Sequence, residues 1–251
     1  RSRRQRQMCI RDSIVGAFQL IENKQFQKFC ELYERKSHLR ATTADYADLM
    51  PGNYMRALLG AKKIEQLIEF CQNEVKRREQ IDRTTTDFYI GLSIGYFLQN
   101  NFDKAGKALI DGSKAKYQDI ARTEVACIMY WESVSTHNDV LKRESKKILK
   151  NRLRAKVSPH NLVTAAFLLD RCDENDMHSL IDGIENSILK YRALVLCYFC
   201  IAAKQLERGD QNGYSEALRQ VCMLYDKSPA VTIEIEYHLA NILFQEGQRD
   251  I

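Results

Sequence analysis

The sequence predicts an all-α protein built from a repeated pair of antiparallel helices. Only 3 prolines and 11 glycines interrupt 251 residues, of which 45% are hydrophobic. The apolar residues recur every three or four positions, which is the spacing of an amphipathic helix. Apparent helix pairs also recur with a period of 34 to 39 residues, which is typical of stacked helical hairpins in an α-solenoid. We therefore expect about six and a half pairs and almost no strand.

One pair is marked more clearly than the others, between residues 86 and 118. Its pattern consists of Tyr89, Leu92, Ser93, Tyr96, Phe102, Asp103, Ala105, Leu109 and Gly112. A second copy, over 196–231, repeats it with Tyr198, Ala202, Ala217 and Pro229, and with three residues (211–213) added in the turn. Only small side chains let two helix backbones come close, so the sequence predicts that Ser93 meets Ala105 and that Ala202 meets Ala217.

The remaining pairs keep the period and lose most of this pattern. Aligned on the last core residue of each first helix, the units fall at Leu20, Leu59, Tyr96, Tyr130, Leu169, Gln205 and Leu243. The turns that separate the paired helices are expected at residues 23–24, 61–63, 100–101, 136–138, 172–175 and 209–213. Several turns place an Asn, Asp, Ser or Thr just before the second helix, where its side chain can accept from free backbone amides.

These units resemble tetratricopeptide repeats (TPRs), which would make residues 14–251 one right-handed α-solenoid domain. The resemblance is strongest over 86–118 and 196–231. It implies a concave groove, lined by the first helices, that binds a protein or peptide. Pentatricopeptide repeats, which bind RNA, have a similar period, but this chain lacks their regularity.

The positions that would line the groove are apolar or aromatic. They are Ile90, Ile94, Ile128, Trp131, Val163, Phe167 and Phe199. In the resembled family a pocket for a terminal carboxylate uses Lys and Asn at positions that hold Ile90, Ile94 and Phe199 here, which argues against a carboxylate clamp. Such a surface suits an amphipathic helix or apolar peptide, with Trp131 as its main anchor. The alternative is that these residues pack as core between neighbouring helices.

The formal net charge of +5 comes mostly from the first residues. Residues 3–12 match the translation of a sequencing-library adaptor, so we interpret 1–13 as a non-native or disordered leader, the alternative being a native basic arm. Residues 1–12 carry five arginines and one acid, a net of +4, which leaves about +1 for the rest. This balance argues against a nucleic-acid partner. We also expect native residues to be missing before residue 14 and the last helix pair to be cut after residue 250.

One predicted helix, residues 139–156, is strongly cationic. Its candidate patch for an anionic partner consists of Lys142, Arg143, Lys146, Lys147 and Lys150, followed by Arg152, Arg154 and Lys156. The alternative is a solvated outer face, since the apolar residues of this helix follow the opposite stripe: Val140, Leu141, Ile148, Leu149 and Leu153. Lys76, Arg77 and Arg78 form a smaller cluster of the same kind.

The sequence offers no pattern for catalysis, a cofactor or a metal. The five histidines fall in separate units, and no glycine-rich phosphate loop or nucleophile elbow is present. Cys197 and Cys200 form a CxxC inside an apolar run, where buried thiols are the simpler interpretation. Seven cysteines outside the leader, without clustered spacing, favour reduced thiols and a cytoplasmic location. No apolar stretch reaches the ~18 residues of a membrane span.

The sequence therefore predicts a noncatalytic scaffold that binds a protein or peptide in an apolar groove. An alternative is the ligand- or peptide-sensing repeat domain of a transcription regulator. A third hypothesis is nucleic-acid binding through the 142–156 region.

Overall fold

The structure, a computed structural model, describes residues 15–35, 49–81, 84–115, 121–154 and 158–248. Every regular element in this part is helical, as the sequence predicts, and the expected leader at 1–13 lies outside it. Residues 15–22 form the first described helical stretch. The elements that follow are α2 (Phe26–Arg35), α4 (Leu49–Gly60), α5 (Ile64–Glu79), α6 (Thr86–Leu98), α7 (Phe102–Lys114), α8 (Ala121–Ser135), α9 (Asp139–Arg152), α10 (Pro159–Leu168), α11 (Glu174–Asp182), α12 (Ser187–Glu207), α13 (Gln211–Lys227), the 3₁₀ helix η1 (Pro229–Ile233) and α14 (Ile235–Gly247).

Each turn between paired helices ends its first helix in the same way. One residue has a positive φ, between 53° and 75°, at Lys24, Lys62, Asn100, His137, Asp170 and Gly209. The next amide donates to the carbonyl five residues back, at 2.8 to 2.9 Å, and the accepting residues are Leu20, Leu58, Tyr96, Ser133, Ala166 and Gln205. This is the Schellman arrangement, which satisfies the free carbonyls at a helix end. Its recurrence at intervals of 38, 38, 37, 33 and 39 residues shows the repeat directly in the backbone.

The alignment made from apolar residues had the correct helix ends at Leu20, Tyr96 and Gln205. It was displaced by one residue at Leu59 and by three at Tyr130 and Leu169, because a buried stripe continues over more than one helical turn and does not mark the final carbonyl. Residues 211–213 are not an insertion in the turn. They form the first turn of α13, because Asp210 caps that helix by accepting from the Gly213 amide.

The expected capping side chains are present at four of the second helices. Asn101, Asn138, Asp173 and Asp210 each accept a hydrogen bond from the amide three residues further on. Each bond satisfies one of the amides left free at a helix start, a contribution of about 1 kcal/mol. The polar residues that the sequence placed in turns therefore fix where the second helices begin.

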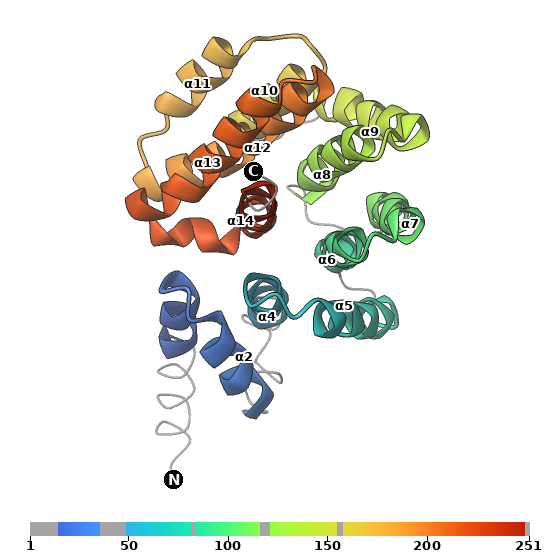
Figure 1. The fold of residues 1–251 in the computed structure, drawn as a ribbon, viewed down its shortest axis with the longest axis vertical. Coiled ribbons are helices and arrows are strands. Elements are labelled where there is room, and N and C mark those ends of the chain that lie inside the picture. The colour runs from blue at the N-terminus through green and yellow to red at the C-terminus, as the bar shows by residue number, and fades with distance from the viewer. Residues whose placement is uncertain (1–14, 36–48, 82–83, 116–120, 155–157, 249–251) are drawn as a thin grey trace.

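The helix pairs pack in sequence along an arc (Figure 1). Each of α4, α6, α8, α10 and α12 packs against the helix that follows it, and also against the next first helix along the chain. The arc then bends back on itself: α12 packs against α8 as well as α10, and α14 lies in the middle of Figure 1, where it contacts α12, α13 and α4. The first helices therefore face one another across a filled interior.

The two ends of the described chain meet at a seam, which we define by Glu22, Lys24, Phe26, Tyr225 and His238. The Tyr225 hydroxyl donates to the Glu22 carbonyl at 2.7 Å, and Lys24 Nζ lies 3.6 Å from the centre of the Tyr225 ring. The rings of Phe26 and His238 pack edge to face with centroids 5.1 Å apart. Aromatic and cation–π contacts of this kind add about 0.5 to 1.5 kcal/mol each beyond the area that they bury.

The small residues of the repeat pattern are buried, but their contacts differ in part from those expected. Ser93 donates from its hydroxyl to Glu132 Oε2 of α8 at 2.6 Å, so it joins one helix pair to the next. Gly112 marks a close approach between α6 and α7, since a Cβ there would lie 2.6 Å from Tyr89 Cβ. Three other pattern residues are exposed: Phe102, Asp103 and Pro229, which opens η1. The rest are buried or half-buried: Tyr89, Leu92, Tyr96, Ala105, Leu109, Tyr198, Ala202 and Ala217.

Within the described residues, no helix combines the length and the apolar character that crossing a membrane requires.

Candidate functional site

The seven residues proposed for an apolar groove lie in the core. Ile90, Ile94, Ile128, Trp131, Val163, Phe167 and Phe199 are between 0 and 8% exposed. The prediction of an open apolar groove is thus corrected, and the alternative that the sequence left open, core packing, describes these residues. The physical reason is the return of the arc, because α12 packs directly on α8 and α14 fills the space beside α4.

Trp131 illustrates this correction. Its ring lies 4.7 Å from that of Phe97 on α6 and 5.8 Å from that of Phe199 on α12, measured between centroids. Its Nε1–H donates to the Tyr214 hydroxyl of α13 at 3.4 Å. The side chain is 1% exposed, so it joins three helices of the fold and offers no surface to a partner.

The cations of α9, in contrast, gather around one open trough on the outer surface. It has a volume of about 510 Å³ and is lined by Asp139, Lys142, Arg143, Lys146, Lys147, Lys150, Asn151 and Arg154. The five residues of the predicted patch all belong to it. Residues three or four positions apart share a helix face, which explains why Arg143, Lys146, Lys150 and Arg154 line the same trough. Arg152, which the sequence grouped with them, is buried on the opposite side.

Most of these cations have no acidic neighbour. Lys142 Nζ lies 2.6 Å from Glu207 Oε1 of α12, and Lys147 makes a looser contact of 3.6 Å with Glu144. Among the residues that the structure describes, none pairs with Arg143, Lys150 or Arg154 through an ion pair or hydrogen bond. Six cations and Asp139 line the trough, and Glu207 and Glu144 pair with two of the lysines, so the surface keeps an excess of positive charge.

A buried polar network holds this helix in place. Lys204 of α12 is 4% exposed, and its Nζ lies 2.6 Å from Asp170 and 2.7 Å from Glu207. Burial alone would raise the pKa of Glu207, but hydrogen bonds from Lys142, Lys204 and Tyr130 lower it to about 2. The carboxylate is thus ionised at any ordinary pH and ties α9 to α12. The cationic trough lies on a rigid base.

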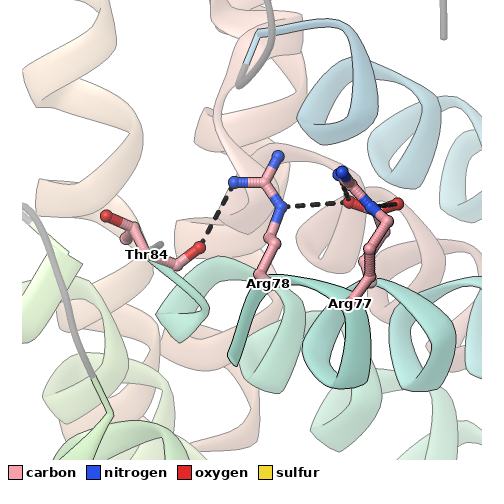
Figure 2. Close-up of polar contacts among 4 residues, drawn as sticks. Arg77, Arg78 and Thr84 are labelled. Atoms are coloured by element: carbon pink, nitrogen blue, oxygen red, sulfur yellow. Dashed lines mark hydrogen bonds and ion pairs between the residues drawn. The ribbon is translucent and has the colours of Figure 1, made fainter. Parts of the chain in front are cut away.

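The smaller cluster on α5 has a different role. Figure 2 shows Arg77 and Arg78 turned toward the same carboxylate, that of Glu74, at 2.6 and 3.0 Å. Arg78 is 1% exposed and also donates to the Thr84 carbonyl at 3.3 Å. Arg78 thus connects the end of α5 to the residues just before α6, whereas Arg77 pairs with Glu74 of its own helix. The prediction that the cluster resembles the cations of α9 is wrong for Arg78, which is buried, while Lys76 and Arg77 are exposed.

A further group of charges, which the sequence did not reveal, lies at the starts of two first helices. Glu124 stands in the first turn of α8 and Glu236 in that of α14. Burial, followed by the charge of Glu234, raises the pKa of Glu236 to about 7. Burial and then the charge of Glu236 raise the pKa of Glu124. The two residues belong to hairpins far apart in the chain, so no spacing connects them. Acidic residues favour helix starts, which gives them a structural role.

The cysteines also belong to the core. Cys197 and Cys200 are at most 1% exposed and are free thiols. Burial raises the pKa of Cys197 to about 12, which leaves the thiol protonated and a weak nucleophile. In the part of the chain that the structure describes, no three His, Cys, Asp or Glu side chains come together as metal ligands.

No protein-family model, curated protein or solved structure matches this chain. The cationic trough of α9 is therefore judged on its own geometry, and it is the candidate functional site.

Proposed function

We propose that this chain is a noncatalytic protein-binding scaffold, a right-handed TPR-like α-solenoid, that holds an acidic segment of a partner protein along the outer face of α9. The observation that carries the proposal is the trough in which Arg143, Lys150 and Arg154 lie without an acidic partner among the described residues. The partner surface thus differs from the apolar groove that the sequence suggested, while the class of function, protein binding without catalysis, is kept.

An acidic peptide suits this surface better than a nucleic acid does. The 14 residues of α9 extend over about 20 Å, so the cations form one short stripe and not a broad basic face. The lining of the trough includes no aromatic side chain on which a base could stack. Outside residues 1–12 the chain is also close to neutral, at about +1.

Fluorescence anisotropy with a labelled, glutamate-rich helical peptide tests the proposal. The full chain is used with the five arginines of residues 1–11 replaced by glutamine, so that they do not attract the peptide. The double variant Arg143→Glu, Lys150→Glu should weaken binding by about tenfold or more, because two attractive ion pairs become repulsive. The matched control, Arg219→Glu with Lys227→Glu, reverses two exposed cations of α13 and should change the affinity by less than about twofold.

Two further measurements decide between explanations. Affinity should fall as salt is raised from ~0.05 to 0.5 M, because exposed charges are screened. A single-stranded oligonucleotide of the same net charge should bind more weakly than the peptide. Equal loss of affinity in the α9 and α13 variants would exclude the trough as the binding surface, and tighter binding of the oligonucleotide would favour the nucleic-acid hypothesis.

A further inference from the structure

A small apolar hollow lies beside the cationic trough, between α7 and the start of α9. It has a volume of about 290 Å³ and presents Gly106, Ile110, Val140 and Leu141, with Lys107 and Asp103 at its edge. Val140 is 54% exposed although α9 is otherwise cationic on its outer surface. Its volume lies at the lower end of the ~300 to 1,000 Å³ typical of small-molecule sites, so it has room for an aliphatic side chain.

Gly106 is buried on α7, yet a methyl group would fit at this position. A Cβ at this position would lie 3.6 Å from Glu132 Oε1 and 3.7 Å from Leu141 Cδ2, which are ordinary contacts. Alanine would thus fit there without moving any neighbour. The glycine is therefore not required by a close approach, and a methyl group added there would occupy part of the hollow that Gly106 lines.

The hollow and the trough are both lined by residues of α9. Val140, Arg143 and Lys147 are separated by three and four residues, so they share one side of α9. Arg143 and Lys147 line the trough, and Val140 lines the hollow. A helix lying along α9 would therefore bring one apolar side chain to the hollow and acidic side chains to the cations about one and two turns away.

From this juxtaposition we infer that the partner segment is an amphipathic acidic helix with one aliphatic anchor, such as leucine, that inserts between α7 and α9, and with glutamate or aspartate three to four and seven positions from the anchor. The inference rests on the proposed function. It adds the anchor, which converts a general attraction between charges into recognition of a particular residue spacing.

Two synthetic peptides test it, one with a central leucine and glutamates at this spacing, and one with alanine in place of the leucine. The full chain, with the leader arginines replaced as above, should bind the leucine peptide about tenfold more tightly, as expected for burial of one aliphatic side chain. Val140→Ser and Gly106→Ala should each reduce this preference to less than about threefold, the first by removing an apolar wall and the second by partly filling the hollow. Leu189→Ser, at an exposed leucine of α12, is the matched control and should leave the preference unchanged.

The outcomes separate the anchor from the trough. The double variant Arg143→Glu, Lys150→Glu should weaken both peptides by the same factor and preserve the preference for leucine. Equal affinities for the two peptides, with binding still lost in the double variant, would overturn the anchor and leave the proposed function intact. If neither peptide binds the unaltered trough, the anchor and the proposed function fail together. A preference that Val140→Ser and Leu189→Ser reduce equally would also overturn the anchor.

Discussion

Two kinds of helix contact hold this molecule together, and they differ in what the sequence reveals about them. Between the α6–α7 pair and the α8–α9 pair, the joined residues are one repeat apart, as in the hydrogen bond from Ser93 to Glu132 across 39 residues. At the seam the bond from Tyr225 to Glu22 spans 203 residues. A repeat period constrains the first kind of contact and says nothing of the second. Long-range packing of the second kind also determines the surface, because the contact of α12 with α8 buries residues that the sequence proposed for an apolar groove.

The largest expected effect comes from Trp131, which takes part in both kinds of contact. Its ring packs on Phe97 of the neighbouring pair and on Phe199 of the distant α12. Trp131→Ala should lower the free energy of unfolding by about 3 to 5 kcal/mol, the usual cost of removing a buried aromatic ring. Urea unfolding followed by circular dichroism measures this change.

Trp131→Phe is the control for that experiment, since it keeps a six-membered aromatic ring and removes the five-membered ring that carries the donor to Tyr214. It should cost clearly less than the alanine substitution. If Trp131→Ala instead left stability unchanged and abolished partner binding, the side chain would be a surface anchor, and the core position described above would be wrong.

Glu132, the buried glutamate that joins the α8–α9 pair to the α6–α7 pair, should make stability depend on pH. Burial raises the pKa of Glu132 from 4.5 to about 7, although the hydrogen bond from Ser93 opposes this shift. The folded protein thus holds a proton that the unfolded chain has lost, so stability falls as pH rises from 4.5 to 7. Glu132→Gln should remove this loss of stability. At pH 8 its free energy of unfolding should exceed that of the original protein by on the order of 3 kcal/mol, and near pH 4.5 the two should differ little. A difference that is constant from pH 4.5 to pH 8 would contradict this account.

The buried histidine of the seam should show the opposite dependence. Burial lowers the pKa of His238 from 6.5 to about 4, while its hydrogen bond to the Thr232 carbonyl opposes the shift and the charges of Arg56 and Lys24 reinforce it. Between pH 6.5 and 4 this histidine is protonated in the unfolded chain and neutral in the folded protein, so stability is lost as pH falls through this range. His238→Gln should flatten this part of the stability profile by on the order of 3 kcal/mol. Profiles of equal slope between pH 6.5 and 4 for the two proteins would refute the assignment.

The sequence predicted what local spacing determines. The all-helical fold, most turn positions and the capping residues Asn101 and Asn138 followed from the apolar period and from residues that favour turns. The cap Asp210 did not, because residues 211–213 were predicted in the turn and form the first turn of α13. The cations of α9 were also found, because residues three or four apart on one helix share a face. The hollow above Gly106 was missed, since it depends on how α7 and α9 pack.

The burial of the groove residues could not be decided from spacing. An aromatic residue on a first helix has the same pattern whether it faces a partner or another helix of the chain, and only the contact between α12 and α8 settles the matter. In the same way the α5 cluster and the α9 patch look alike as runs of cations. They differ because Glu74 accepts from both Arg77 and Arg78, whereas no described acid takes that place beside Arg143 or Lys150.

A tightly packed glycine at the seam, Gly60, should have a smaller effect on stability. A Cβ on Gly60, the last residue of α4, would lie 2.6 Å from Cδ2 of Phe26 and would push that ring away from His238. Gly60→Ala should therefore destabilise the protein by about 1 to 3 kcal/mol, despite the better helix propensity of alanine. Gly247→Ala is the matched control, because it also ends a helix and its Cβ would meet nothing within 4 Å. Thermal unfolding that ranks the two variants equally would contradict the close contact at the seam.

The smallest expected effect is a stabilisation, and it occurs at Gly106 in the α6–α7 pair. Gly106→Ala places a methyl group in ordinary contact with Glu132 and Leu141, so it introduces no clash and should stabilise α7 by up to about 1 kcal/mol. The same methyl group enters the hollow beside Val140, so the more stable variant should bind the leucine peptide less tightly. Thermal unfolding and peptide titration of one sample measure both changes. If the hollow does not bind the leucine side chain, Gly106→Ala should stabilise the protein without weakening its affinity for the leucine peptide.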